Sequence, residues 1–374
     1  MHVTAIVLAR AGAGALALAL TSGTAALAGW NEPALPRYQV IDLGTLGGAS
    51  STAQALNDKG QVVGWSETAS GTRHAFIYDH GMMQDLGTLV GGSHSYATGI
   101  NEHGQVVGYS GINAFGSQFP EIDQGFVWDP TGMRSLGALF CPCSYNDRYG
   151  ASSGYAINDK GWVSGSSETV RGSWVLHAAL WRDGVAEDLG GGAGDWSISR
   201  SFGMNARGFV VGDYAQDAGK VNAYEREASL WRGSTRTALG TLPGSTSSIA
   251  LAVNLQGAVV GWSGTFDGAA SHAFIWRRGS MQDIGALKHD ANSAALAIDA
   301  AGDVVGWSGA SRSGDSHAFL WRFGEMLDLN QSIPSYSGWV LNEAAGINRR
   351  GEIVGTGLHD GETHAFLLIP VIKP

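Results

Sequence analysis

Apolar and polar residues alternate in short runs along most of the chain, and these runs recur as one repeating unit. The clearest phrase has nine residues: an apolar residue, Asn or Asp, two variable residues, Gly, a variable residue, two mostly apolar residues and Gly. It begins at seven places: Leu56, Ile100, Ile157, Met204, Val253, Ile298 and Ile347. The copies lie roughly 48 residues apart, a period typical of propellers and solenoids.

Each repeat continues with a run of the type His-Ala-Phe-Ile-Trp and then a run ending in Asp-Leu-Gly. We therefore predict four short strands per repeat. Strand A precedes the Asn, strand B holds Val-Val-Gly, strand C opens with His-Ala-Phe, and strand D ends at Asp-Leu-Gly. The Asn can cap its own turn and the Gly after it can take positive φ, so this A–B turn is a structural feature rather than a ligand-binding ring. The Gly that ends Val-Val-Gly indicates a close backbone approach, which we expect where sheets crowd together.

The two ends of the chain distinguish an open solenoid from a closed ring. The seventh repeat stops after strand C, and residues 38–44 supply a matching strand D before the first repeat. A blade built from both termini removes the exposed sheet edges of an all-β protein, whereas a β-solenoid has no reason to split a repeat. We predict an all-β, seven-bladed β-propeller of four-stranded blades over residues 38–370, with a linker at 29–37 and a tail at 371–374.

The N-terminal 28 residues have the pattern of a secretory signal peptide. Arg10 precedes the apolar run 11–20, and Ala26-Leu27-Ala28 forms a small-residue cleavage site. The run is too short to span a bilayer, and no later apolar stretch is long enough either. We expect cleavage near Ala28 and a secreted protein, extracellular or periplasmic.

The repeated His-Ala-Phe at 74–76, 272–274, 317–319 and 364–366, together with the Asp-Leu-Gly and Asn-x-x-Gly phrases, resembles the HAF repeat of bacterial extracellular repeat proteins. The resemblance extends over residues 38–369. It implies export and a repeat β fold, and it implies no particular activity. Repeats two and four depart from it, with Gln124-Gly125-Phe126 and Glu227-Ala228-Ser229 in place of His-Ala-Phe.

Histidine on strand C occurs together with aspartate on strand D. The two repeats without the histidine are also the two without the aspartate, so we predict a charge-assisted hydrogen bond between the strands rather than catalysis. The predicted pairs are His74 with Asp85, His177 with Asp188, His272 with Asp283, His317 with Asp328, and His364 with Asp42. Strand C is third from the axis, which places the five histidines too far apart to share a metal ion, and we expect no metal site.

Long, irregular connections join B to C and D to the next A, and both kinds share one face of a propeller. We expect any ligand site on this face, because binding residues tend to lie on variable loops held by a rigid scaffold. The candidate ligand-binding residues are the aromatic residues of these loops: Tyr145, Tyr149, Trp174, Trp196, Tyr336 and Trp339. The residue six before each Asn is serine in six repeats (Ser51, Ser95, Ser152, Ser199, Ser248 and Ser293), either to satisfy backbone groups or to line the mouth of the channel.

Composition narrows the function classes. The net charge is −10 and 15% of residues are charged, so the chain lacks the basic surface that nucleic acid requires. No phosphate loop, nucleophile elbow or calcium loop appears, and no cofactor is expected. We expect a binding module for a glycan or protein, without catalytic residues. The alternative is a polysaccharide hydrolase or lyase with its site at the channel mouth, where the inner strands offer only Glu343. The oligomeric state stays open, and so does the state of Cys141 and Cys143. These cysteines could be free or paired between molecules, form a strained bridge with each other, or supply half of a metal site with a histidine such as His94.

Overall fold

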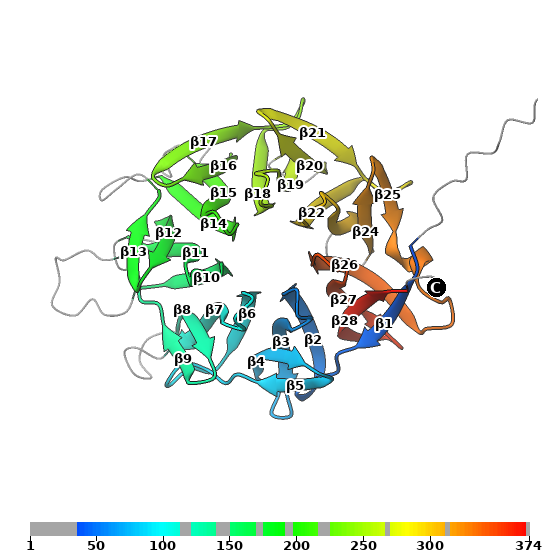
Figure 1. Ribbon diagram of the computed structural model, residues 1–374, viewed down its shortest axis with the longest axis horizontal. Coiled ribbons are helices and arrows are strands. Elements are labelled where there is room, and N and C mark those ends of the chain that lie inside the picture. Colours follow the sequence, from blue (N-terminus) through cyan, green and yellow to red (C-terminus); the bar gives the residue numbers. More distant parts are fainter. Residues whose placement is uncertain are drawn as a thin grey trace, which may run out of the picture. The chain divides into compact units, whose positions relative to one another are not determined.

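The computed structural model describes residues 36–112, 121–139, 150–169, 175–190, 197–215, 225–265, 270–310 and 315–371. These residues form seven four-stranded antiparallel sheets arranged in a ring (Figure 1). The predicted seven-bladed β-propeller is therefore confirmed. Within the same ranges, the one helix is the short 3-10 helix η1 (Leu329–Ser332), and no helix is long and apolar enough to cross a membrane. The predicted signal peptide lies outside them.

Each of the first three blades uses four strands in chain order. Blade 1 contains β2 (Gly47–Leu56), β3 (Val62–Thr68), β4 (Arg73–Asp79) and β5 (Met82–Asp85). Blade 2 contains β6 (Ser95–Ile100), β7 (Val106–Ile112), β8 (Ile122–Asp129) and β9 (Gly132–Ser135). Blade 3 contains β10 (Ser152–Ile157), β11 (Val163–Glu168), β12 (Leu176–Arg182) and β13 (Val185–Asp188).

The next three blades follow the same order, from the inner strand A to the outer strand D. Blade 4 contains β14 (Ile198–Met204), β15 (Phe209–Ala215), β16 (Glu227–Arg232) and β17 (Thr235–Gly240). Blade 5 contains β18 (Ser247–Val253), β19 (Val259–Gly264), β20 (Ser271–Arg277) and β21 (Ser280–Gly285). Blade 6 contains β22 (Asn292–Ile298), β23 (Val304–Gly309), β24 (Ser316–Arg322) and β25 (Glu325–Asp328).

Blade 7 combines both ends of the described chain. Its inner strands are β26 (Trp339–Ile347), β27 (Ile353–His359) and β28 (Glu362–Pro370), and its outer strand is β1 (Tyr38–Asp42). Strand β1 runs antiparallel to β28, with Tyr38 opposite Pro370 and Asp42 opposite Phe366. The predicted closure of the ring by the N-terminal strand is confirmed.

The hydrophobic core is divided among the blade interfaces. Seven clusters of buried residues are present, and each draws its members from two neighbouring blades. Strand C is buried on both faces, which explains the apolar residues of His-Ala-Phe. Ala75 packs against blade 2, and Phe76 packs against blade 7. A strand buried on both faces is apolar at successive positions.

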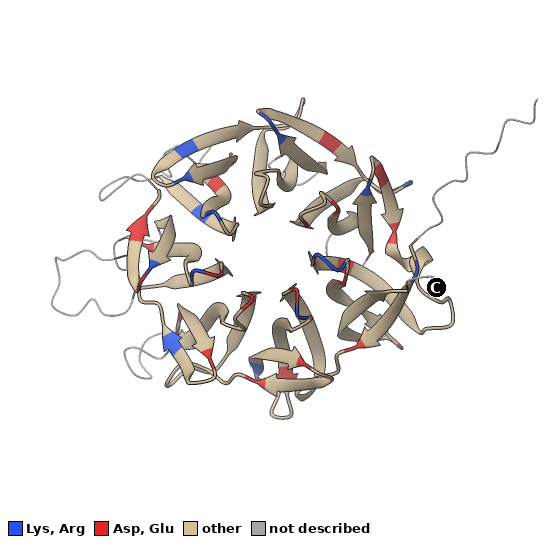
Figure 2. Ribbon diagram, in the orientation of Figure 1, with Lys and Arg blue, Asp and Glu red and all other residues tan. Residues whose placement is uncertain are grey.

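The Asn of each A–B turn also joins neighbouring blades. The Asn57 side chain accepts the backbone N–H groups of Lys59 and Gln61, as expected of a capped turn, and its Nδ2 donates to the Asn101 carbonyl at 3.0 Å. The same donation to the next blade is made by Asn101, Asn205, Asn254 and Asn348. These turns lie at one end of the ring, which we call the turn face. Acidic and basic residues are both present there, at the inner tips of the blades (Figure 2).

Candidate functional site

A β-bulge in every inner strand directs one side chain toward the axis. In blade 5 the register shifts between Ala250 and Ala252, which leaves Leu251 as the extra residue, and the other six inner strands shift at the equivalent place. The seven bulge residues, each three before the turn Asn or Asp, are Gln54, Thr98, Tyr155, Phe202, Leu251, Leu296 and Ala345. A bulge re-aims the side chain of its extra residue, and all seven line one cavity.

The glycine that ends Val-Val-Gly makes room for this bulge. A Cβ atom on Gly261 would lie 1.9 Å from the carbonyl oxygen of Ile249, which is on the inner strand of the same blade. Equivalent contacts of about 2 Å occur at Gly64, Gly108, Gly165, Gly212, Gly306 and Gly355. The expected close approach is present, but the idea that crowding between sheets causes it is wrong. The approaching backbone is strand A of the same sheet, brought close by its own bulge.

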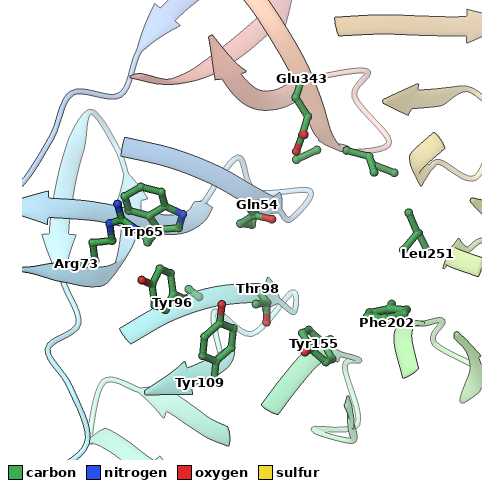
Figure 3. Close-up of a pocket in the computed structure, with 13 residues that line it drawn as sticks. Gln54, Trp65, Arg73, Tyr96, Thr98, Tyr109, Tyr155, Phe202, Leu251 and Glu343 are labelled. Atoms are coloured by element: carbon green, nitrogen blue, oxygen red, sulfur yellow. The ribbon is translucent and has the colours of Figure 1, made fainter. Parts of the chain in front are cut away.

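The cavity has a volume of about 460 Å³. Besides the bulge residues, its lining includes Trp65, Tyr96, Tyr109, Arg73 and Glu343 (Figure 3). Arg73 begins strand β4, where the connection from β3 enters the blade, so the cavity belongs to the face that carries the B–C and D–A connections. We call this end the loop face. The long connections predict a site on this face, but the bulge residues share no residue type that would reveal them.

One side of the cavity is an aromatic wall formed by Trp65, Tyr96, Tyr109, Tyr155 and Phe202. Tyr96 stacks on Tyr109 with ring centroids 5.0 Å apart and meets Trp65 edge-on at 5.9 Å. Tyr155 and Phe202 continue the wall with centroids 5.4 Å apart. The guanidinium of Arg73 lies over Trp65, 4.6 Å from the ring centroid, an arrangement that favours a cation–π contact.

The opposite side of the cavity is an aliphatic wall of Leu251, Leu296 and Ala345. Glu343 is the single carboxylate among the described residues of the lining. Two-carboxylate glycoside hydrolysis needs a second acid about 5–9.5 Å away, and these lining residues supply none. Burial is the main cause that raises the pKa of Tyr109, with Tyr155, Asp123 and Tyr96 adding to it. The phenol of Tyr109 is therefore a neutral hydrogen-bond donor.

The serine ring lies between the blades rather than on the channel. Ser95 is fully buried, accepts the Ala75 N–H at 2.8 Å and donates to the Gly87 carbonyl at 2.6 Å. Ser51, Ser152, Ser248 and Ser293 make the same two bonds, and Ser199 accepts from Ala178. The alternative that these hydroxyls line the channel mouth is wrong, because the backbone of the preceding blade uses them.

The predicted ligand-binding aromatic residues fall into two groups. Tyr145, Tyr149, Trp174 and Trp196 lie outside the described residues, as do Cys141 and Cys143. Tyr336 is 90% exposed on the connection from blade 6 to blade 7 and stays a candidate. Trp339 is buried, and its indole stacks on the His359 ring with centroids 4.6 Å apart. Its face is therefore covered by its own blade.

Four of the five predicted His–Asp pairs form hydrogen bonds between strands C and D. Nδ1 of the histidine lies 2.9 Å from a carboxylate oxygen in each of His74–Asp85, His177–Asp188, His272–Asp283 and His364–Asp42. The aspartate has a second role that the sequence analysis missed. It accepts the N–H of the glycine two residues later, at 2.7 Å for Asp283 and Gly285, which explains the Asp-Leu-Gly phrase.

Blade 6 departs from the prediction. No hydrogen bond joins His317 to Asp328, although both residues are described. Asp328 accepts the N–H two residues later, at Asn330, as the other aspartates do, but it also accepts from Nδ2 of Asn330. Asn330 stands where the other blades have glycine, and Asp328 caps η1. The His317 ring lies 3.7 Å from Asp290. The change of one residue, from Asp-Leu-Gly to Asp-Leu-Asn, redirects the carboxylate.

Blades 2 and 4 replace the pair instead of losing it. In blade 2, Ser135 donates to Gln124 at 2.7 Å and accepts the N–H of Gly137, so a neutral pair keeps both functions. In blade 4, Arg236 lies 3.9 Å from Glu227. Each of these blades therefore retains a polar link between its two outer strands.

Blade 7 adds a second histidine to its pair. His359 Nδ1 lies 2.8 Å from Asp42, and the ligand atoms of Asp42, His359 and His364 are all within 4.8 Å of one another. Burial raises the pKa of Asp42, but hydrogen bonds from Gly44, His364 and His359 outweigh it and hold that pKa below its ordinary value. His359 lies at the end of strand B, outside the repeated phrases, and was therefore not predicted as a partner of Asp42.

Neither a protein-family model nor a curated protein sequence matches this chain. Among solved structures, YCF48 bound to D1 peptide is similar with a TM-score of 0.51 and 12% identity, over 91% of this chain and 100% of that one. The β-propeller domain of the Trilobed protease from Pyrococcus furiosus gives a TM-score of 0.49 and 13% identity, over 75% and 81%. The acylaminoacyl peptidase of Pyrococcus horikoshii gives 0.47 and 13%, and this chain covers 43% of it. These likenesses show the propeller fold alone.

Proposed function

We propose that this protein is an exported binding module whose loop-face cavity holds an apolar segment of a partner peptide. The observation that carries the proposal is that the cavity has two apolar walls of different kinds. The aromatic wall includes the bulge residues Tyr155 and Phe202, and the bulge residues Leu251, Leu296 and Ala345 form the aliphatic wall. Flat aromatic rings and leucine side chains can pack against an apolar side chain, while the hydroxyls of Tyr109 and Tyr155 can bond a peptide backbone.

The aliphatic wall favours a peptide over a sugar. A sugar carries hydroxyls around its whole perimeter, and those facing Leu251 and Leu296 would lose water without gaining a partner, at a cost of about 1–3 kcal/mol each. A peptide can present an apolar side chain to the leucines and its polar backbone to the opposite wall. YCF48, whose fold is similar to that of this chain, was solved bound to D1 peptide, and this supports a peptide as the ligand class.

Export belongs to the same proposal. The pattern of residues 1–28 and the resemblance to HAF-repeat proteins support it. N-terminal sequencing of the protein recovered outside the cytoplasm should begin at Gly29. An intact N-terminus in that fraction would contradict cleavage near Ala28.

The peptide proposal can be tested with a cavity-filling variant. Ala345→Trp places an indole in the cavity from the aliphatic side and leaves the aromatic wall unchanged. Peptides enriched from a random displayed library on the wild-type protein should bind this variant at least tenfold more weakly, because the indole occupies their volume. Fluorescence polarisation with the labelled peptides measures the change.

The matched control is Ala300→Trp, since Ala300 is exposed in the A–B turn of blade 6 on the turn face. This variant should keep the wild-type affinity. A glycan array run in parallel tests the other ligand class. Glycans whose binding is lost in Ala345→Trp, with no peptide that behaves this way, would overturn the peptide proposal.

A further inference from the structure

The junction between the N-terminal strand and the last blade contains a three-residue cluster of metal-ligating side chains. Asp42 ends β1, His364 lies on β28, and His359 ends β27. Oδ2 of Asp42 is 2.8 Å from Nδ1 of His359 and 2.9 Å from Nδ1 of His364. Both imidazoles therefore direct the same nitrogen at one carboxylate.

This arrangement matches a three-ligand site with open positions for water. Zinc takes imidazole nitrogens at about 2.0–2.1 Å and carboxylate oxygens at about 2.0–2.2 Å. Three such ligands lie about 3–3.5 Å from one another around one ion, and the three ligand atoms here all lie within 4.8 Å. The side chains are 28%, 29% and 21% exposed for Asp42, His359 and His364, so an ion can reach them from solvent.

Blade 7 differs from the other blades in the feature that creates the cluster. Its B–C connection is the two-residue turn Asp360-Gly361, both with positive φ, and β27 therefore continues to His359 opposite Glu362. Trp339 stacks on the His359 ring with an interplanar angle of 4°, which fixes the orientation of the imidazole. Oδ2 of Asp360 is 3.9 Å from the other ring nitrogen, Nε2. Such outer partners orient the histidines of metal sites.

We propose that Asp42, His359 and His364 bind one divalent transition-metal ion, for which zinc is the probe, and that the ion fastens β1 to the β27–β28 hairpin. On binding, each neutral histidine takes the tautomer with its proton on Nε2, exchanging its Nδ1 proton through solvent without net release. The two Nδ1 lone pairs and a carboxylate oxygen of Asp42 then replace three waters of the ion. The ion would then connect the two ends of the ring, so that its binding energy adds to ring closure.

The test is a zinc titration of the propeller by calorimetry, in a Cys141→Ser, Cys143→Ser background that removes competing thiols. The parent protein should bind one equivalent, and its melting temperature should rise by about 3–6 °C at 100 times the Kd. His359→Gln should weaken binding at least tenfold. The variant should fold normally, because it keeps the His364–Asp42 pair. Blades 1, 3 and 5 fold with one equivalent His–Asp pair and no second histidine.

The matched control is His74→Gln, which alters a pair without a second histidine and should leave zinc affinity unchanged. Cobalt supplies a second readout, since its visible absorption spectrum reports the number and type of ligands and should change in His359→Gln. If His359→Gln fails to fold, His359→Asn repeats the comparison. Equal zinc affinity in the parent and either His359 variant, or no stoichiometric binding by the parent, would overturn the proposal.

Discussion

At the scale of the residue, one position in the A–B turns differs in a way that changes the contact between blades. Asn57, Asn101, Asn205, Asn254 and Asn348 each donate a side-chain hydrogen bond to the next blade. Blade 6 has Asp299 there, whose ionised carboxylate has no hydrogen to donate. Its Oδ1 still accepts the N–H groups of Gly302 and Asp303, so the turn itself is preserved.

Replacing Asp299 with Asn should therefore stabilise the protein. The amide keeps an oxygen for the two turn N–H groups and adds a donor toward blade 7, a gain of about 1 kcal/mol in the free energy of unfolding. Urea denaturation at pH 7 measures the gain. The same substitution at Asp58, whose turn already has Asn57, is the control and should change stability by less than about 0.5 kcal/mol.

The gain from Asp299→Asn should depend on pH. Burial is the main cause that raises the pKa of Asp299 above its ordinary value, with the charge of Asp303 adding to it against three backbone N–H groups. Compared with the unfolded chain, the folded wild-type protein favours the protonated form of Asp299. Protonation therefore contributes to the stability of the wild-type protein at low pH, and this contribution is lost as the pH rises from the unfolded pKa through the folded pKa. The difference between variant and wild type should be larger at pH 7 than at pH 3.5. An equal difference at both would contradict the assignment.

At the scale of the strand, the His–Asp pair and the Asp–Gly cap share one carboxylate. Asp283→Ala should cost more than His272→Ala, because the former loses both the histidine and the Gly285 N–H while the latter loses one partner. Both side chains are more than a third exposed, so we expect about 0.5 kcal/mol for His272→Ala and about 1–1.5 kcal/mol for Asp283→Ala.

The double variant measures the coupling. Its cost should fall short of the sum of the single costs by about 0.3–0.5 kcal/mol in thermal or urea unfolding. His177→Ala, at a fully buried histidine of the same pair type, should cost more than His272→Ala and calibrates the effect of burial. Additive costs for His272 and Asp283, or equal costs for the two single variants, would count against the shared role.

The strands show which features the sequence could predict. Val-Val-Gly, His-Ala-Phe and Asp-Leu-Gly recur because each repeat packs against neighbours of the same type, so the blade number, the strand order and the closure of the ring could be predicted. The bulge could not be predicted, because the type of its residue differs between repeats, from Gln54 to Phe202. The repeats share only the position of the bulge. The single available signal was the glycine of strand B, whose missing side chain faces the bulge. His359 has no counterpart in the other repeats, so only the short Asp360-Gly361 turn pointed to it.

At the scale of the whole molecule, ring closure depends on five residues of β1. Deleting residues 30–44 should expose the edge of β28 and remove Asp42 from His364, since an unpaired edge strand is a template for association. We expect a lower melting temperature and oligomers in size-exclusion chromatography with light scattering.

Deleting residues 30–35 alone is the matched truncation, because it leaves β1 in place. This shorter deletion should remain as monodisperse and as stable as the wild-type protein. If the longer deletion behaved in the same way, the outer strand of blade 7 would be dispensable for closure.

The pairing of Tyr38 with Pro370 has a further consequence, which concerns where the polypeptide needs to begin. The ends of the ring lie side by side, and every blade boundary contains a cluster of buried residues from both neighbours. A short peptide could therefore join the two ends, and the chain could be opened instead at the exposed Pro243-Gly244 turn between blades 4 and 5. Such a circular permutant would have seven blades of uninterrupted sequence. Chains that begin at different blades could therefore fold into the same seven-bladed ring.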